Sequence, residues 1–469
     1  MLLDATMKEN YQNILLIFFS FCTLFLINPN WFYLEIGGPD QWAALMYIER
    51  FDNFYSDILG ARTSRFGWLI PGQFFINKFK DVGIIVFPAL YFFITIITYY
   101  FTLKLFFNSN ISLFFSLFAL SYMELHGSYG WLYMSNFSLT YLIISIYMFF
   151  KGLKNNKQNF LFVSGFFSAI AILTYSTTIL FFILFPIILF LNYRKEIKIF
   201  FINCLIYLLG FSFLVIISII FFYLRYDIFL IGSHFLKFQI PFIFSSFDYT
   251  LYFSLKWKQM LNSGWSSPNL IHYLVMAPSY ALCMFVAIVS TYLLIKEKFF
   301  LRYLRVSNQS TKLLFSLYAL LNHSFQVLYA LLSYLLFQNS FLYPKHHFFL
   351  VLGLSTILAL SAIIYLLKNN IFDRKLKFSN KVLFLLFPGS LIFFYFFNNQ
   401  FDEFLFFGKN YFFIIIFCIL FLFILFKTKF KSFNYIIIFL IFMNIQSSSG
   451  KPPVGKAISY YNYDRCSYR

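Results

Sequence analysis

An aspartate stands early in the chain, just after the first apolar run and at the start of a polar stretch. Asp40 follows Gly37-Gly38-Pro39, and proline is favoured at the first position of a helix, so Asp40 should fall in the first turn. The helix dipole keeps a carboxylate ionised there, and an ionised carboxylate can accept a proton from a hydroxyl. A helix-terminal carboxylate without a catalytic role fits Asp40 as well.

Two arginines follow in the same stretch. Arg62 and Arg65 are three residues apart, so on a helix they share a face. Two guanidinium groups on one face can hold a phosphate. Interfacial arginines that meet lipid headgroups are the competing interpretation.

Glu124 is the only acid between Asp81 and Glu196. It lies at the outer end of an apolar run, where an unpaired charge is costly unless it is used or solvated. Glu124 is therefore a candidate second carboxylate, for a metal or for orienting an acceptor. A solvated acid at a helix end is the alternative.

A late basic segment reads Tyr343-Pro344-Lys345-His346-His347. Lys345 and His346 could bind a phosphate leaving group. Adjacent histidines do not have the spacing of metal ligands on a helix, so no metal site is predicted. Anchoring at the membrane interface is the alternative interpretation.

The composition places all these residues in a membrane protein. Of the 469 residues, 61% are hydrophobic and 11% charged, with a mean hydropathy of +0.76, whereas soluble globular domains are about 25% charged. The net charge of +19 would indicate nucleic acid in a soluble protein. Here the positive charges lie between apolar runs, which favours membrane lipids as partners and excludes nucleic acid.

The apolar runs predict an all-α polytopic bundle of about thirteen transmembrane helices, with interfacial helices in the first outer loop. About 20 apolar residues span the hydrocarbon. The runs are 12–32, 82–103, 110–123, 135–150, 159–174, 176–193, 199–223, 271–295, 313–337, 348–367, 382–399, 410–426 and 432–447.

Charge sorting predicts the orientation. With a cytoplasmic N-terminus, the inner segments hold 21 of the 36 basic residues and 5 of the 17 acids, as the positive-inside rule expects. The long loops 32–81 and 225–269 then face outward. We expect one transmembrane domain over 1–447 and a short outer tail over 448–469.

Together these segments resemble the C-type fold of membrane glycosyltransferases, and most closely the protein O-mannosyltransferases and the lipid A aminoarabinose transferases. Asp40 stands where those families have an early acid. The stretch Tyr55–Gly72 is similar to their amphipathic loop helices, residues 159–193 to their middle hairpin, and Tyr343–Phe349 to their late basic segment. The chain departs from the mannosyltransferases at Gln41, where they have a second acid, and it has no large C-terminal soluble domain.

The resemblance implies inverting transfer of a sugar from a polyprenyl-phosphate donor to a hydroxyl of a lipid, glycan or protein, at the outer face of a bacterial inner membrane. Asp40 would be the general base and Glu124 its helper. The donor phosphate would be held by Arg62, Arg65, Lys345 and His346. Substrate contacts would come from Tyr55, Asp57, His126 and Tyr343. The resemblance implies no certain cofactor, and a divalent cation stays open.

Two other functions remain open at the level of sequence. A polymerase or ligase of surface polysaccharides also has many spans and uses polyprenyl-linked sugars, but depends on outer-loop arginines and histidines without an early acid. A flippase or transporter would move a lipid-linked sugar without forming a bond. The scarcity of ionisable residues inside the spans weighs against transport.

Overall fold

The computed structural model describes residues 66–120, 134–175, 178–226, 278–295, 311–337 and 353–368, with a few single positions elsewhere. Within these residues every regular element is a helix, and none is a strand. A helix satisfies its own backbone hydrogen-bonding groups, which a chain surrounded by lipid requires. To this extent the predicted all-α class is confirmed.

Three described helices are long and apolar enough to cross a membrane, namely Asp81–Lys104, Asn136–Asn155 and Ile197–Phe221. Shorter apolar helices cover Gln158–Thr174, Ile179–Tyr193, Val286–Ile295 and Leu354–Leu366. Each of these helices falls on a predicted apolar run. The total of about thirteen remains a prediction, because the runs 382–399, 410–426 and 432–447 lie outside the described residues.

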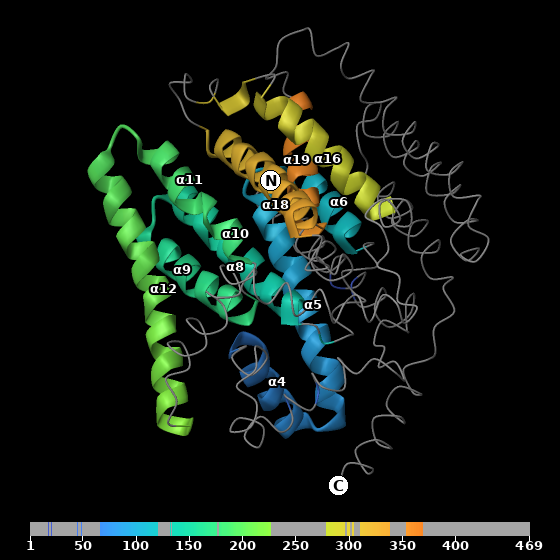
Figure 1. The fold of residues 1–469 in the computed structure, drawn as a ribbon, viewed down its shortest axis with the longest axis vertical. Coiled ribbons are helices and arrows are strands. Elements are labelled where there is room, and N and C mark those ends of the chain that lie inside the picture. The colour runs from blue at the N-terminus through green and yellow to red at the C-terminus, as the bar shows by residue number, and fades with distance from the viewer. Residues whose placement is uncertain are drawn as a thin grey trace, which may run out of the picture.

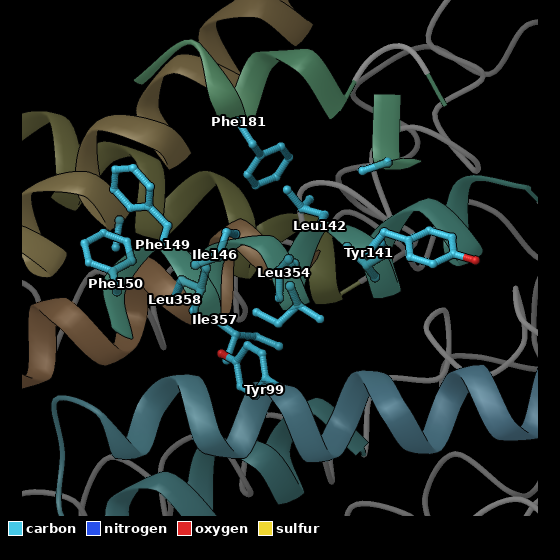
Figure 2. Packing of buried hydrophobic residues seen from close by; sticks show 14 of the residues in the cluster. Tyr99, Tyr141, Leu142, Ile146, Phe149, Phe150, Phe181, Leu354, Ile357 and Leu358 are labelled. Atoms are coloured by element: carbon cyan, nitrogen blue, oxygen red, sulfur yellow. The ribbon is translucent and has the colours of Figure 1, made fainter. Parts of the chain in front are cut away.

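Helix α8 (Met134–Asn155) lies inside the bundle (Figure 1). It packs between α5 (Asp81–Lys104) and α9 (Gln158–Thr174). In Figure 2 its core side chains meet Phe181 and side chains from the segment 354–358. Of the α8 side chains labelled there, Leu142, Ile146, Phe149 and Phe150 are 0% exposed. Burial on several sides explains why α8 reads as an apolar run rather than as one apolar stripe.

Helix α12 (Ile197–Tyr226) lies at one edge of the bundle, on the left in Figure 1. In the most apolar stretch of α12, 22% of the residues are buried, against 78% in the corresponding stretch of α8. Its exposed side includes Phe201, Leu205 and Leu208, and its opposite side buries Tyr207 and Leu214. An exposed stripe this apolar is suited to lipid and not to water.

The interface between α9 and α12 depends on two glycines. A Cβ added at Gly165 would overlap the carbonyl oxygen of Tyr207, and a Cβ added at Gly210 would overlap the carbonyl oxygen of Phe162. The two backbones therefore touch directly. Small residues permit such close packing between helices in lipid, where no hydrophobic force draws helices together.

Helices α10 (Ile179–Phe182) and α11 (Leu184–Tyr193) follow one another with a single turn residue, Ile183, between them. Pro186 is the third residue of α11, where the missing N–H costs no helical hydrogen bond. The described part of the predicted apolar run 176–193 is thus two helices that are separated at Ile183.

Helices α16 (Pro278–Ile295), α18 (Thr311–Phe337) and α19 (Gly353–Lys368) pack on one another. They join the earlier helices through an aromatic contact. The ring of Phe315 in α18 stacks on Phe106, with centroids 4.0 Å apart, and also meets Phe150 of α8 edge-on at 5.2 Å. Phe106 lies between α5 and α6 (Ser109–Leu120).

Helix α4 (Phe66–Phe79) occupies the end of the predicted first outer loop. It folds back along α5, because Phe75 meets Phe87 at 5.6 Å and the carbonyl of Phe75 lies against Gly83. The turn between them is closed at Lys80, which has φ 49° and donates its N–H to Ile76 O at 2.7 Å. Of the predicted loop helices in Tyr55–Gly72, residues 55–65 lie outside the described residues, and residues 66–72 belong to α4, which continues to Phe79 and is buried on one side.

Two hydrogen bonds bring the ends of several helices together. Lys154 at the end of α8 donates from Nζ to the carbonyl of Leu105, just after α5, at 2.9 Å. Tyr193 at the end of α11 donates to Asn156 Oδ1 at 3.2 Å. The two contacts bring the end of α5, the α8–α9 turn and the α11–α12 turn to one end of the bundle, away from Asp81 and the α4–α5 turn.

Candidate active site

The ten residues predicted for catalysis and binding all lie outside the described residues. Their roles stay predictions, and the structure instead places the chain segments that flank some of them. Arg65 immediately precedes the first residue of α4, and Asp40 precedes the described helical position Ile48 by eight residues. The ten are Asp40, Tyr55, Asp57, Arg62, Arg65, Glu124, His126, Tyr343, Lys345 and His346.

The start of α4 is held by two tyrosines from two different helices. Tyr141 of α8 donates its hydroxyl hydrogen to the carbonyl oxygen of Gly67 at 2.7 Å. The same hydroxyl lies 2.5 Å from the hydroxyl of Tyr91 in α5, and all these atoms are buried. Because Tyr141 donates to the carbonyl, Tyr91 donates to Tyr141. These two hydrogen bonds fix the position of the start of α4 against α5 and α8.

Gly67 is required at this position by crowding. A Cβ there would overlap the Thr174 hydroxyl and lie 2.5 Å from Ile170 and 2.9 Å from Tyr141. Ile170 and Thr174 belong to the last turn and a half of α9, and Tyr141 is seven residues into α8. The start of α4 therefore lies about 10 Å inside the end of α8, at 1.5 Å per residue.

A second contact places Ile48, eight residues after Asp40. Ile48 is 0% exposed. A Cβ added at Gly72 would lie 2.8 Å from Ile48 Cγ2 and 3.2 Å from the ring of Phe87. Phe87 in turn stacks on Phe137 of α8, with centroids 4.5 Å apart. The position eight residues after Asp40 is thus fixed against α4 and α5, on the face near α8.

Two threonine hydroxyls at and just after the end of α9 donate hydrogen bonds to nearby backbone carbonyls. Thr174 Oγ1 donates to Ile170 O at 2.7 Å. After the extended residue Tyr175, Thr178 Oγ1 donates to Tyr175 O at 2.7 Å. The last residue of α9, Thr174, lies beside Gly67, so the start of α4 and the end of α9 in the predicted middle hairpin meet at one place.

The helices around this place are joined by uncharged hydroxyl groups. Thr95 of α5 and Thr140 of α8 lie 2.7 Å apart, and Ser145 of α8 lies 2.7 Å from Ser168 of α9. Tyr207 of α12 donates to Ser168 at 2.8 Å. These groups can hold helices in register but cannot take a proton from a sugar hydroxyl at neutral pH. In the described part of the chain, no three metal-ligand side chains gather.

A comparison with known protein families gives a match over the helices that surround the start of α4. Residues 64–238 match the family model of dolichyl-phosphate-mannose-protein mannosyltransferases. No curated protein and no solved structure matches the chain.

The matched range begins one residue before Arg65 and includes α4, α5, α6 and α8 to α12. The resemblance to the protein O-mannosyltransferases stated from the sequence is therefore confirmed over this range. The match supports a membrane glycosyltransferase of the C-type fold that uses lipid-phosphate sugar donors. Of the ten predicted site residues, Arg65, Glu124 and His126 lie within the matched range, and the other seven, Arg62 and Asp40 among them, lie outside it.

A polar cluster in α16, α18 and α19, beyond the mannosyltransferase match, was missed in the sequence. His323 of α18 is 0% exposed, with Nε2 3.0 Å from Cys283 O of α16 and Nδ1 2.9 Å from Ser355 Oγ of α19. The signal was Asn322-His323-Ser324-Phe325-Gln326 inside an apolar run. A buried polar run in a span is a sign of helix contacts or of function.

The hydrogen bonds of His323 favour a structural role. A carbonyl oxygen only accepts, so Nε2 carries the proton, and in the neutral ring Nδ1 accepts from the Ser355 hydroxyl. Both ring nitrogens are then engaged. His323 thus connects three helices and has no nitrogen left for a substrate.

Proposed function

We propose that this protein transfers a sugar, most simply mannose, from a polyprenyl-phosphate donor to an acceptor hydroxyl at the outer face of the membrane, with inversion at the anomeric carbon. The family match over residues 64–238 carries the proposal. The acceptor is a lipid, glycan or protein. A lipid-linked donor reaches its enzyme through the bilayer, so the reaction centre belongs at the membrane surface.

The donor phosphate is assigned to Arg62 and Arg65. Consecutive Cα atoms are 3.8 Å apart, so Arg65 is attached directly to the start of α4, which Tyr141 and Tyr91 hold. Two guanidinium groups beside this part of α4 would stabilise the charge that develops on the leaving phosphate.

The general base is assigned to Asp40. Ile48 is fixed against α4 and α5, and eight residues reach about 28 Å when extended or about 12 Å as a helix. Asp40 is therefore within chain reach of the start of α4. This limit supports Asp40 as a partner of the arginines.

The proposed sugar transfer is a single displacement without a covalent enzyme intermediate. The acceptor oxygen bonds to the anomeric carbon as the bond from that carbon to the phosphate oxygen breaks. The acceptor proton passes to Asp40, and polyprenyl phosphate leaves with the bonding electron pair. One carboxylate behind the acceptor and attack from the face opposite the phosphate give inversion, by analogy with inverting glycosidases.

The orientation is proposed from charge. Lys154, Lys157, Lys195 and Lys198 lie at the end of the bundle where α8 and α11 end, and the positive-inside rule favours the cytoplasmic side for that end. The α4–α5 turn then faces outward, in a bacterial inner membrane with a cytoplasmic N-terminus. The transmembrane domain is assigned to 1–447 and the outer tail to 448–469.

The other assignments rest on the resemblance alone. Glu124 assists Asp40 or holds a divalent cation, and Lys345 and His346 add positive charge at the phosphate. Tyr55, Asp57, His126 and Tyr343 contact the substrate. Glu124 is four residues after Leu120, the last residue of α6, so it lies within about 14 Å of that residue.

The test uses membranes that contain the full chain, a radiolabelled polyprenyl-phosphate mannose and an extract of envelope acceptors. Asp40→Asn should lower transfer by at least about a hundredfold, as expected for loss of a general base, with unchanged protein level. The matched control, Asp373→Asn, replaces an acid in a connector predicted to be cytoplasmic. Full transfer by Asp40→Asn would favour the polymerase or ligase, and donor movement without bond formation would favour the flippase.

A further inference from the structure

The turn between α11 and α12 combines exposed positive charge with two exposed apolar stripes. In Figure 1 it forms the tip of the α11–α12 pair, at the upper left. Lys195 in the turn and Lys198 at the start of α12 are exposed. The charges face the membrane boundary, because the apolar stretch of α12 begins at Ile197.

The turn is held beside a second basic turn. The Tyr193 hydroxyl donates to Asn156 Oδ1 at 3.2 Å, and Asn156 precedes the exposed Lys157. Lys157 caps the start of α9 without a side-chain hydrogen bond to the helix. The hydrogen bond therefore brings the turns that carry Lys157 and Lys195 together.

The local charge balance is positive. Glu196 is the one acid within the two turns, residues 154–158 and 193–198, all of which the structure describes. The five basic residues there are Lys154, Lys157, Arg194, Lys195 and Lys198. Lys154 is engaged by the Leu105 carbonyl at 2.9 Å. Three exposed lysines against one glutamate leave a site that favours an anion.

The apolar stripes continue directly from the charges. Along α12, Phe201, Leu205 and Leu208 are 64%, 58% and 54% exposed, and they follow Lys198 at helical spacing. The neighbouring stripe on α10 and α11 exposes Ile183, Ile187 and Phe190. Phe190 meets Phe200 edge-on at 5.6 Å, so the two stripes run side by side from the turn.

We propose that the α11–α12 turn binds one anionic phospholipid, with its phosphate at Lys195 and Lys198 and its acyl chains along the exposed stripes of α11 and α12. Basic clusters at the ends of transmembrane helices attract anionic headgroups, and the apolar stripes select a lipid over a free phosphate. Lys157 adds charge from the neighbouring turn, and the Tyr193–Asn156 bond positions it. This proposal is independent of the proposed transferase function.

The experiment is native mass spectrometry of the full chain released from nanodiscs of phosphatidylglycerol and phosphatidylcholine in equal amounts. The wild type should retain phosphatidylglycerol in preference to phosphatidylcholine. Lys195→Gln with Lys198→Gln should lower that preference about 25-fold at low salt, since each lysine near an anionic surface contributes roughly fivefold. The matched control is Lys78→Gln with Lys80→Gln, which removes the same charge at the other end of α5 and should keep the preference.

Three results would overturn the proposal. The first is equal retention of the two lipids by the wild type, and the second is an equal loss in the control variant. The third is displacement of the lipid by water-soluble glycerol phosphate at the same concentration, which would mean that the apolar stripes contribute nothing. Tyr193→Phe supplies a further check, because loss of the tie to Asn156 should weaken retention less than loss of the two lysines.

Discussion

Gly165 of α9 and Gly210 of α12 face each other reciprocally, each against the carbonyl oxygen three residues before the other glycine. The oxygen of Tyr207 lies where a Cβ of residue 165 would be, and the oxygen of Phe162 where a Cβ of residue 210 would be. Backbone atoms cannot turn aside as side chains can, so the distance between α9 and α12 is set by these two positions.

Replacing either glycine by alanine should therefore destabilise the protein. Gly165→Ala or Gly210→Ala should lower the free energy of unfolding by about 1–3 kcal/mol, the usual cost of overpacking. The measurement is unfolding in mixed micelles of mild detergent and dodecyl sulfate. Gly152→Ala is the matched control, because its Cβ would first meet the side chain of Leu161 at 3.1 Å, which can move. Equal stability of all three variants would contradict the close contact.

Tyr141 should affect the reaction without touching the substrate. Tyr141→Phe leaves the buried carbonyl of Gly67 without its donor, which costs about 1–3 kcal/mol, and loosens the helix start that follows Arg65. We expect kcat/KM for the lipid-linked donor to fall about tenfold. Steady-state transfer assays at varied donor concentration measure the change.

The control for this prediction lies on the same helix. Tyr147→Phe also removes a tyrosine hydroxyl from α8, but that hydroxyl meets Lys151 Nζ at 3.0 Å near the other end. The variant should keep normal kinetics. If the two phenylalanine variants behaved alike in transfer, Tyr141 would have only a general structural role.

His323 should contribute stability through its two interhelical hydrogen bonds. Such bonds in membrane proteins average about 0.6 kcal/mol and reach roughly 1.7 kcal/mol. His323→Leu should thus lower the unfolding free energy by about 1–3 kcal/mol. His323→Gln should lower it less, because an amide can both donate and accept.

Thermal unfolding in detergent compares these variants with Ser324→Ala. Ser324 accepts a longer bond of 3.3 Å from Thr291 at an exposed position, so its loss should be nearly neutral. A His323→Leu protein as stable as the wild type would show that the three helices are held by apolar packing alone.

The sequence alone was sufficient to predict where several helices lie, but not which residues of different helices contact one another. The run 82–103 coincides with α5 because lipid imposes a minimum apolar length, and the shorter run 159–174 coincides with α9. The predicted loop helices of Tyr55–Gly72 did not include the end of α4 at Phe79, since that end is set by the turn at Lys80 and by packing on α5. Tyr141 looked like any other tyrosine of an aromatic-rich span, because nothing in its local sequence indicates Gly67 as its partner.

The candidate site was predictable only in part for a similar reason. Asp40, Arg62 and Arg65 were singled out by residue type and spacing, and they stay predictions. His323 was passed over because a single histidine in an apolar run does not show whether its ring nitrogens meet a substrate or neighbouring helices. Its partners, Cys283 and Ser355, are 40 and 32 residues away.

The stacked rings of Phe106 and Phe315 have a consequence for where the chain can be divided. Phe106 lies within the range that matches the mannosyltransferase family, whereas Phe315 lies 77 residues after that range ends at residue 238. A fragment that stopped at 238 would expose the rings of Phe106 and Phe150 and lose the edge-on contact of Phe150 with Tyr318. The end of the family match at residue 238 therefore falls inside one continuous packed core, and a fragment cut there would leave part of that core uncovered.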